Sequence, residues 1–358
     1  PPGARPRRHP RQRPDRPGRA RPAQTHAPGH TALYAAGETA IVDDRLQFMP
    51  VSFFSVVMGL SGLSIALQRA NALMPGLQGV GTAVALASAA VFLVLGALYA
   101  AKFARYPAAV REELSHPVKM SFGASFTVSL VLLSIAFHDS ATDLSWWLWA
   151  VGAGLHLAFT LYVLNAWIYQ PHFEIHHISP AWFIPVVGNI LVPVAGVAHG
   201  AIELSWFYFS IGLLFWIVLF TIIVYRMIFH NPLPEKLLPT LFILIAPPAV
   251  GFIAYVQLTN GIDAFAHVLY YGALFLTLLL FMQLPRFLRL PFFLSWWAYS
   301  FPLAAMTIAT LIMHRHTDLG FFSGLAALLL GVLSLIILGL VARTALAIRR
   351  GQICVEGH

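Results

Sequence analysis

One short segment, PHFEIHH at residues 171–177, carries the side chains that most resemble a metal site. Imidazole and carboxylate groups are ligands that zinc accepts, and the segment offers four of them, on His172, Glu174, His176 and His177. The segment is a short loop, however, and it lacks the H-E-x-x-H spacing that places two histidines on one face of a helix. We therefore expect a loop that folds against the cytoplasmic end of the helices, with no metal and no cofactor.

Other patterns that carry chemistry are missing from the sequence. The single cysteine, Cys354, can form neither an intrachain disulfide nor a cysteine-based metal site. The sequence has no glycine-rich phosphate loop after a strand, no nucleophile elbow and no paired carboxylates in an apolar cleft. We expect no enzymatic activity.

Charged side chains avoid the middle of the long apolar stretches. Glu203 and Asp263 lie only at their edges. Coupling to protons or sodium needs a carboxylate inside the membrane, so a cation pathway is disfavoured. Since no Lys or Arg lies deep in a stretch either, the solute that fits is an anion that binds weakly and passes quickly. His156 lies in mid-stretch, and we expect it to hydrogen-bond a neighbouring helix rather than to titrate during transport.

Small and hydroxylated residues are frequent in several stretches, and five of them are candidates to line a passage. Hydroxyl groups and backbone N–H groups can contact an anion without trapping it. The candidates are Ser55, Gly59, Ser125, Gly188 and Asn189. The alternative is that these small residues serve close packing between membrane helices, which is their common use.

The elements that must position these residues are membrane helices. The chain is 58% hydrophobic and only 10% charged, whereas a soluble domain carries about 25% charged residues. Apolar stretches of about 20 residues, long enough to cross a bilayer core, recur along the chain. We predict an all-α polytopic membrane protein whose ten spans lie near 48–68, 79–103, 118–138, 145–168, 180–198, 204–228, 237–258, 263–283, 293–313 and 319–346.

Prolines fall in, or at the start of, the odd-numbered spans. They are Pro50, Pro117, Pro180, Pro185, Pro193, Pro239, Pro247, Pro248 and Pro302. A proline in a membrane helix is tolerated where the freed backbone groups are buried in protein or face a water-filled cavity. We therefore predict that five kinked odd-numbered helices surround a central pore and that five straight helices face lipid or neighbouring subunits. The predicted kinks are at Pro50, Pro117, Pro185, Pro193, Pro247, Pro248 and Pro302.

Basic residues set the expected topology. Eight of the 22 Lys and Arg lie in residues 1–44, twelve flank one side of the ten spans, and only Arg69 and Arg315 flank the other side. This distribution places both termini in the cytoplasm and argues against a nucleic-acid site. We expect three regions. Residues 1–47 form a disordered basic Arg/Pro-rich tail, or a mis-assigned start, 48–347 form the ten-helix transmembrane domain, and 348–358 form a short C-terminal tail.

Four segments resemble one known family. They are MPVSFFSVVMGLSGLSIA (49–66), SHPVKMSFGA (115–124), FEIHHISPAWFIPVVGNILVPVAG (173–196) and WWAYSFP (296–302). Each is similar to a segment of the tellurite-resistance/dicarboxylate transporter family, which includes bacterial TehA proteins and the slow anion channels of plant guard cells. The resemblance implies five helical hairpins around a pore, a homotrimer, and a pore gate at the phenylalanine of the last motif, here Phe301.

These observations together favour an anion channel or facilitator in the inner or plasma membrane. It would pass small inorganic anions or small carboxylates through a pore gated by Phe301 in mid-membrane. The alternative is a secondary transporter or exporter of C4-dicarboxylate, sulfite or tellurite-type oxyanions, which is what the family resemblance also implies. A membrane subunit without transport is less consistent with five bent helices, since a solid bundle gains nothing from them.

Overall fold

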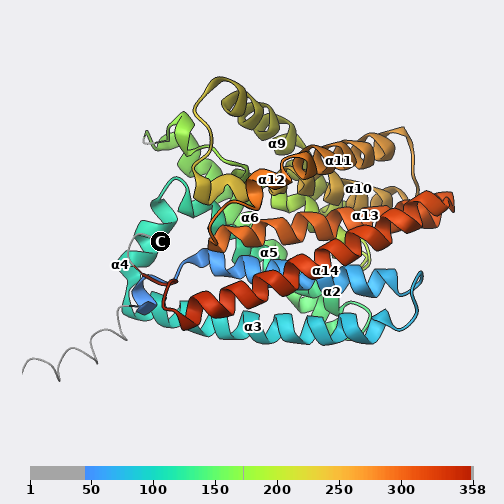
Figure 1. Ribbon diagram of the computed structural model, residues 1–358, viewed down its shortest axis with the longest axis horizontal. Coiled ribbons are helices and arrows are strands. Elements are labelled where there is room, and N and C mark those ends of the chain that lie inside the picture. Colours follow the sequence, from blue (N-terminus) through green and yellow to red (C-terminus); the bar gives the residue numbers. More distant parts are fainter. Residues whose placement is uncertain (1–44, 172, 356–358) are drawn as a thin grey trace, which may run out of the picture. The chain divides into compact units, whose positions relative to one another are not determined.

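The computed structural model describes residues 45–171 and 173–355, and all regular structure in these residues is helical (Figure 1). The predicted N-terminal tail, residues 1–47, lies outside the described residues except for residues 45–47. The elements are η1 (Val51–Phe53), α2 (Phe54–Ala70), α3 (Leu77–Arg105), α4 (Pro107–Ser115), α5 (Lys119–Phe137), α6 (Thr142–Tyr169), η2 (Ile175–His177), η3 (Pro180–Trp182), α7 (Phe183–Val187), η4 (Gly188–Leu191), α8 (Pro193–Gly196), α9 (Ile202–Phe229), η5 (Glu235–Ile245), α10 (Ala246–Thr259), α11 (Ala264–Met282), α12 (Leu284–Phe287), η6 (Leu294–Tyr299), α13 (Ser300–Thr317) and α14 (Gly320–Arg349).

Nine helical segments among the described residues are long and apolar enough to cross a membrane. They correspond to nine of the ten predicted spans. The fifth predicted span is a shorter apolar segment, Pro180–Gly196, that is divided into η3, α7, η4 and α8. The last span, α14, ends at Arg349, two residues beyond the predicted boundary at 347. The chain is thus a multi-pass membrane protein, and the regular structure of its described part is all helical.

Burial alternates from one span to the next. In the spans that begin with η1, α5, η5 and η6, between 72% and 94% of the most apolar stretch is buried, against 11% to 39% in α3, α6, α9, α11 and α14. Pro180–Gly196 is also almost wholly buried. We call these five buried segments the inner spans. The outer helices instead expose large apolar side chains, as a lipid-facing surface must, and examples are Leu93, Ile168, Leu214, Phe275 and Leu335.

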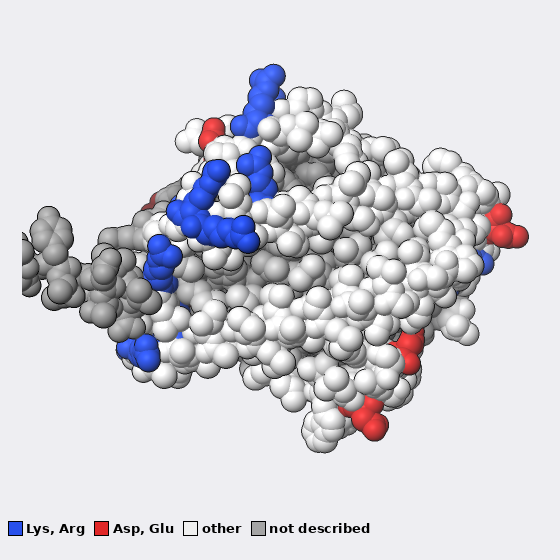
Figure 2. All heavy atoms as spheres, turned by 60° about the horizontal axis from the view of Figure 1, so that its bottom comes forward, with Lys and Arg blue, Asp and Glu red and all other residues white. Residues whose placement is uncertain are grey.

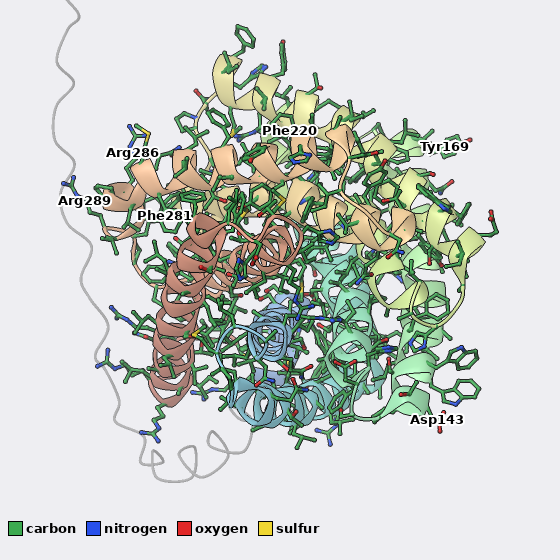
Figure 3. The ribbon with its side chains drawn as sticks, turned by 90° about the vertical axis from the view of Figure 1, so that its right-hand side faces the viewer. Asp143, Tyr169, Phe220, Phe281, Arg286 and Arg289 are labelled. Carbon is green, nitrogen blue, oxygen red and sulfur yellow. The ribbon has the colours of Figure 1, made fainter. Side chains whose placement is uncertain are left out.

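The inner spans contact one another in a closed series. Helix α2 packs against α5, α5 against α7, η4 against α10, α10 against α13, and α13 against α2 again. Each inner span also packs against the outer helix that follows it in the chain. Figure 3 shows the outer layer from one end, with Asp143 and Tyr169 of α6, and Arg286 and Arg289 beyond α11, at the periphery.

Most inner spans begin as a 3₁₀ helix and continue as an α-helix. The change occurs after Phe53, Ile245 and Tyr299, and 3₁₀ segments inside membrane-length helices often mark irregular, functional positions. Pro302 is the third residue of α13, and Pro247 and Pro248 lie in the first turn of α10. First-turn N–H groups have no partner within their helix, so the missing proline N–H costs little there.

The remaining predicted kink residues also lie at the beginnings of short helical segments or within the broken fifth span. Pro50 directly precedes η1, Pro117 lies in the turn that leads into α5, and Pro193 is the first residue of α8. Pro185 lies inside α7, where its carbonyl oxygen accepts a hydrogen bond from the Thr160 hydroxyl at 2.7 Å. The neighbouring helix α6 therefore stabilises the interrupted backbone.

Both described ends of the chain lie at the same end of the helices, which we call the terminal end; the other is the far end. Arg45 Nη2 lies 2.8 Å from the position that a Cβ on Gly351 would occupy. Figure 2 shows most Lys and Arg of one face gathered at one end and most Asp and Glu at the other. The charge asymmetry expected from the sequence is therefore present in the fold.

A buried ion pair joins three elements at the terminal end. Lys102 Nζ of α3 lies 2.7 Å from Glu113 Oε2 of α4, and both side chains are less than a tenth exposed. Glu113 Oε1 accepts a hydrogen bond from the backbone N–H of Val51 at 2.7 Å, and Lys102 donates to the carbonyl of Met49 at the same distance. The start of the first inner span is thereby tied to the short helix α4.

Candidate functional site

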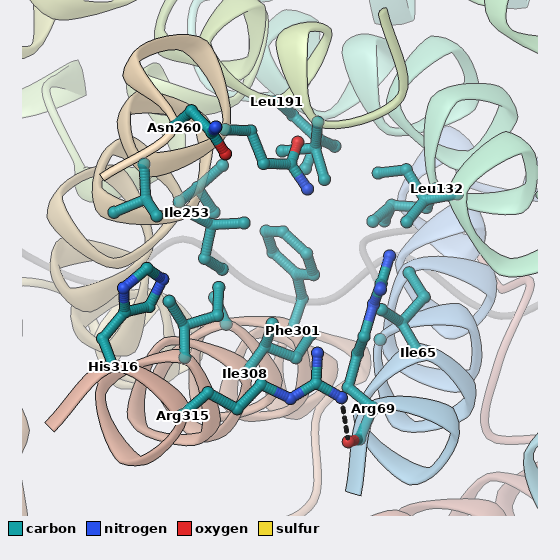
Figure 4. Close-up of a pocket in the computed structure, with 18 residues that line it drawn as sticks. Ile65, Arg69, Leu132, Leu191, Ile253, Asn260, Phe301, Ile308, Arg315 and His316 are labelled. Carbon is teal, nitrogen blue, oxygen red and sulfur yellow. Dashed lines mark hydrogen bonds between the residues drawn. The ribbon is translucent and has the colours of Figure 1, made fainter. Parts of the chain in front are cut away.

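The larger cavity described in the structure has a volume of about 220 Å³ (Figure 4). Its 18 lining residues all come from the inner spans or from the residues that end them, and none comes from an outer helix. They are Gly62, Ile65, Arg69, Leu132, Ile135, Leu191, Val194, Val250, Ile253, Val256, Gln257, Asn260, Phe301, Ala305, Ile308, Ile312, Arg315 and His316.

A second cavity of about 50 Å³ is lined almost entirely by apolar side chains from the same five spans. Leu191, Val250 and Phe301 line both cavities. These three residues therefore form the boundary between the two spaces. The second cavity is otherwise lined by Met58, Val128, Phe183, Ile184, Val187, Gly188, Ile190, Ile243, Ala246 and Pro247.

Phe301 is the second residue of α13, immediately after the 3₁₀ segment η6. Its ring points into the larger cavity (Figure 4). A Cβ on Gly62 would lie 3.4 Å from Phe301 Cδ2 and 2.9 Å from the Cβ of Ala304. Gly62 therefore allows α2 to approach α13 closely beside the ring, and a larger residue would press on it. The sequence marks Gly62 only as one of several small residues in its span.

The wall of the larger cavity is aliphatic in its depth and polar at its far end. Arg69, Arg315, His316, Gln257 and Asn260 all lie near the ends of α2, α13 and α10 that are remote from Phe301. No Asp or Glu is among the described residues that line either cavity. The two spaces thus place no fixed negative charge against an anion, and the aliphatic wall offers it few partners.

Of the five expected lining residues, all of which are described, one borders either of these two cavities. Gly188 lines the smaller one, and a Cβ on it would lie 2.8 Å from His156 Nε2. Ser55 donates to the carbonyl of Ser52 at 2.6 Å, and Ser125 donates to that of Phe122 at 2.6 Å. These two hydroxyl groups are thus engaged by the preceding turn of their own segment.

The other two expected lining residues serve helix contacts. Gly59 lies against Ser300 and Trp297, so its missing side chain lets α2 approach the start of α13. Asn189 is fully buried, and its Nδ2 donates to Thr160 Oγ1 at 2.9 Å and to the carbonyl of Val186 at 2.7 Å. Neither residue lines the two cavities described here, and the contacts match the packing alternative.

The histidines singled out in the sequence lie in two places, inside α6 and in the loop before the fifth inner segment. His156 is fully buried, and its Nδ1 lies 2.7 Å from Thr127 Oγ1 of α5, which confirms the expected bond to a neighbouring helix. In the loop before the fifth inner segment, His176 Nδ1 lies 3.2 Å from Glu174 Oε2, and His177 accepts from the backbone N–H of Glu174. Within residues 45–171 and 173–355, no three His, Cys, Asp or Glu side chains are grouped to hold a metal, and His172 lies outside them.

Residues 48–345 match a family model described as the voltage-dependent anion channel. The chain is similar to the S-type anion channel SLAH3 of Arabidopsis thaliana, with 29% identity over 226 residues that cover 63% of this chain and 36% of that protein. It is similar to the tellurite resistance protein TehA homolog of Haemophilus influenzae, with 27% identity over 274 residues that cover 75% and 82% of the two chains.

The chain is also similar to the uncharacterized transporter MJ0762 of Methanocaldococcus jannaschii, with 26% identity over 288 residues, 74% of this chain and 84% of that protein. The match to the family model covers nearly all of the membrane-spanning part described above, including every residue that lines the two cavities. The members of this family are channels and transporters rather than enzymes. The chain therefore belongs to the voltage-dependent anion channel family.

Proposed function

We propose that this chain passes small anions across the membrane through a central pore between its inner spans, and that Phe301 is the gate. The observation that carries the proposal is the position of Phe301 on the boundary between the two cavities, which only inner spans line. An aromatic ring in an apolar constriction stops ions by steric closure and by dewetting. Displacing the ring would join the two spaces into one path.

The Phe301 ring lies at the irregular start of α13 and faces the cavity, into which it would move. Phe301 follows the junction of η6 and α13, where the backbone changes from 3₁₀ to α-helix. Its side chain is only partly buried, whereas Leu303, Ala304 and Ala305 behind it are buried. The anchored residues hold the helix while the ring faces open space, as a gate requires.

The family and the charges support the rest of the proposed arrangement. Each inner span packs against the following outer helix, which fits five helical hairpins around the pore. The basic terminal end would face the cytoplasm, following the usual distribution of Lys and Arg. The resemblance to TehA and slow anion channels further implies a homotrimer, in which part of the apolar outer surface would be covered.

The variant Phe301→Ala tests the gate in reconstituted bilayers. We expect the anion current to rise strongly, because the alanine leaves the boundary open. The matched control is Phe275→Ala, which removes the same ring from the exposed face of α11 and should leave the current unchanged. Equal currents in wild type and Phe301→Ala, with both proteins intact, would refute the gate assignment.

The same recordings separate a channel from a carrier. A channel gives unitary current steps and a reversal potential that follows the anion gradient, which can be measured with chloride, nitrate, sulfite and malate. Transport that saturates without unitary events would instead support the exporter alternative for oxyanions or dicarboxylates. Neither current nor flux in the wild type would overturn the proposed function altogether.

A further inference from the structure

Two arginine side chains line the far end of the larger cavity. Arg69 is in the last turn of α2, Arg315 is in the last turn of α13, and both line the cavity. Arg315 Nη2 donates to the backbone carbonyl of Arg69 at 3.5 Å, which places the Arg315 guanidinium against the end of α2, and the Arg69 side chain lines the same rim (Figure 4). His316 and Asn260 complete this polar rim.

Neither arginine has an acidic partner among the described residues. No ion pair joins Arg69 or Arg315 to a carboxylate there, and no Asp or Glu lines the cavity. Asp318 follows α13 closely in sequence, but it is not paired with Arg315. Two positive charges on one rim repel each other, so an anion bound at the rim would lower its electrostatic energy.

The usual distribution of Lys and Arg in membrane proteins does not explain why Arg69 and Arg315 lie at the far end. Lys and Arg are otherwise concentrated at the terminal end, while the far end carries acidic residues in its loops. The preference for basic residues in the cytoplasm would select against arginine here if the far end faces outward. Their presence at the mouth of the cavity, rather than elsewhere on this end, points to a ligand.

One helix face connects the rim to the gate. Phe301, Ala305, Ile308, Ile312 and Arg315 line the cavity at the three- and four-residue spacing of a single helix stripe. At about 1.5 Å per residue, Arg315 lies roughly 20 Å along the helix from Phe301. An anion held at the rim would therefore still have to cross the apolar part of the cavity before it reaches Phe301.

The side-chain amide of Gln257 lies at the same end of the cavity, and its oxygen lacks a hydrogen-bond donor in the described structure. That oxygen, Oε1, is buried. This oxygen is an acceptor and so cannot bind an anion directly, but it can accept a hydrogen bond from water that the anion carries. The rim is thus suited to an anion that is still partly hydrated.

We propose that Arg69 and Arg315 form an outer anion site, which binds a small oxyanion or carboxylate before it reaches Phe301. Guanidinium groups match such ions because their N–H groups form two parallel hydrogen bonds to two oxygens of one ion. Arg315 is exposed and Arg69 is partly buried, so the bound ion stays in contact with water and is released readily. This inference rests on the proposed transport function and adds the site at which the anion is captured.

The test uses the full chain in planar bilayers, with nitrate or chloride added on the far side only. Labelling the single cysteine, Cys354, with a membrane-impermeant thiol reagent identifies the side that carries the C-terminal tail. The variants are Arg69→Gln, Arg315→Gln and both together. The matched control is Arg289→Gln, an exposed arginine that follows α12 and does not line the cavity.

We expect each neutral variant to raise the half-saturating nitrate concentration about fivefold at low ionic strength, since one charge at about 4 Å has an effect of that size in water. The effect should shrink at high salt and should be absent in Arg289→Gln. The charge-preserving variants Arg69→Lys and Arg315→Lys should keep the chloride dependence of wild type but lose preference for nitrate, because lysine lacks the planar fork.

Two failures can be told apart. If wild type conducts and the double variant has the same half-saturating concentration from the far side, the outer anion site is refuted while the transport function stands. If wild type itself conducts no anion, the proposed function fails first. An equal effect from the terminal side would also refute the site, because the arginines lie at the far end only.

Discussion

The buried ion pair at the terminal end gives a sharp prediction about stability. Glu113 accepts hydrogen bonds from Lys102 Nζ and Val51 N, both at 2.7 Å, and from the Tyr99 hydroxyl at 3.1 Å. The variant Glu113→Ala removes the carboxylate and therefore all three hydrogen bonds at once. Lys102 is 3% exposed, so its ammonium group would remain buried with the Met49 carbonyl as hydrogen-bond partner and the Tyr99 ring centroid 5.3 Å away, and without a counter-charge.

The expected cost is about 3–5 kcal/mol, the range found when one partner of a buried ion pair is removed. The unpaired Val51 N–H adds to this cost but not independently, since it belongs to the same network. The neighbouring Glu112 lies on the same helix and is exposed, and its backbone carbonyl accepts a hydrogen bond from the Ser115 hydroxyl. The control Glu112→Ala should therefore change the free energy of unfolding by no more than about 0.5 kcal/mol.

The assay is equilibrium unfolding in mixed micelles, followed for single variants and for the pair Lys102→Met with Glu113→Leu. The double variant removes both charges, so it should be destabilised far less than the sum of the singles, with a coupling of roughly 3 kcal/mol. Additive effects of the two substitutions would refute the reasoning. So would a Glu113→Ala protein as stable as Glu112→Ala.

Two further predictions concern packing and pH. Gly212→Ala in α9 should destabilise the fold by about 1–3 kcal/mol, because the added Cβ would lie 2.7 Å from Ile190 N. The control Gly272→Ala should not destabilise the fold, because its added Cβ meets nothing within 4 Å. Equal unfolding curves for the two variants would contradict this prediction. Burial, with nearby basic groups, lowers the pKa of His116, whose Nδ1 accepts from Val118 N at 3.1 Å. The folded state thus favours neutral His116, and stability should fall as pH drops through about 6.5; a His116→Gln protein with the same pH dependence as wild type would contradict this.

Several features of the fold followed from the sequence for clear physical reasons. A bilayer admits only segments that satisfy their own backbone, so the long apolar stretches had to be helices. Prolines gathered in alternate stretches because an irregular backbone is tolerated only where protein or a cavity surrounds it. The same stretches, from the segment around Pro50 to the one containing Pro302, are the buried inner spans.

The lining of the cavities did not follow from residue type. Ser55 and Ser125, which we predict to face a passage, line neither of the two cavities described above, and their hydroxyl groups donate to carbonyls three residues earlier. The hydroxyl group of a serine in a membrane helix can donate to a carbonyl of the preceding turn. The presence of a serine therefore says little about whether its side chain faces a passage. The cavity walls are mainly Ile, Leu and Val, which no local pattern distinguishes from core residues.

The sequence by itself determined the membrane class, the alternation of apolar stretches with and without prolines, the asymmetry of basic residues, and the family motifs, because each depends on composition or on local spacing. The tertiary structure alone decided which side chains meet. It placed Phe301 on the boundary of two cavities, Gly62 beside its ring, and Arg69 next to Arg315, which are separated by 246 residues in the chain. Such meetings depend on the closed series of inner spans, and helix-to-helix packing of that kind leaves no local signature in the sequence.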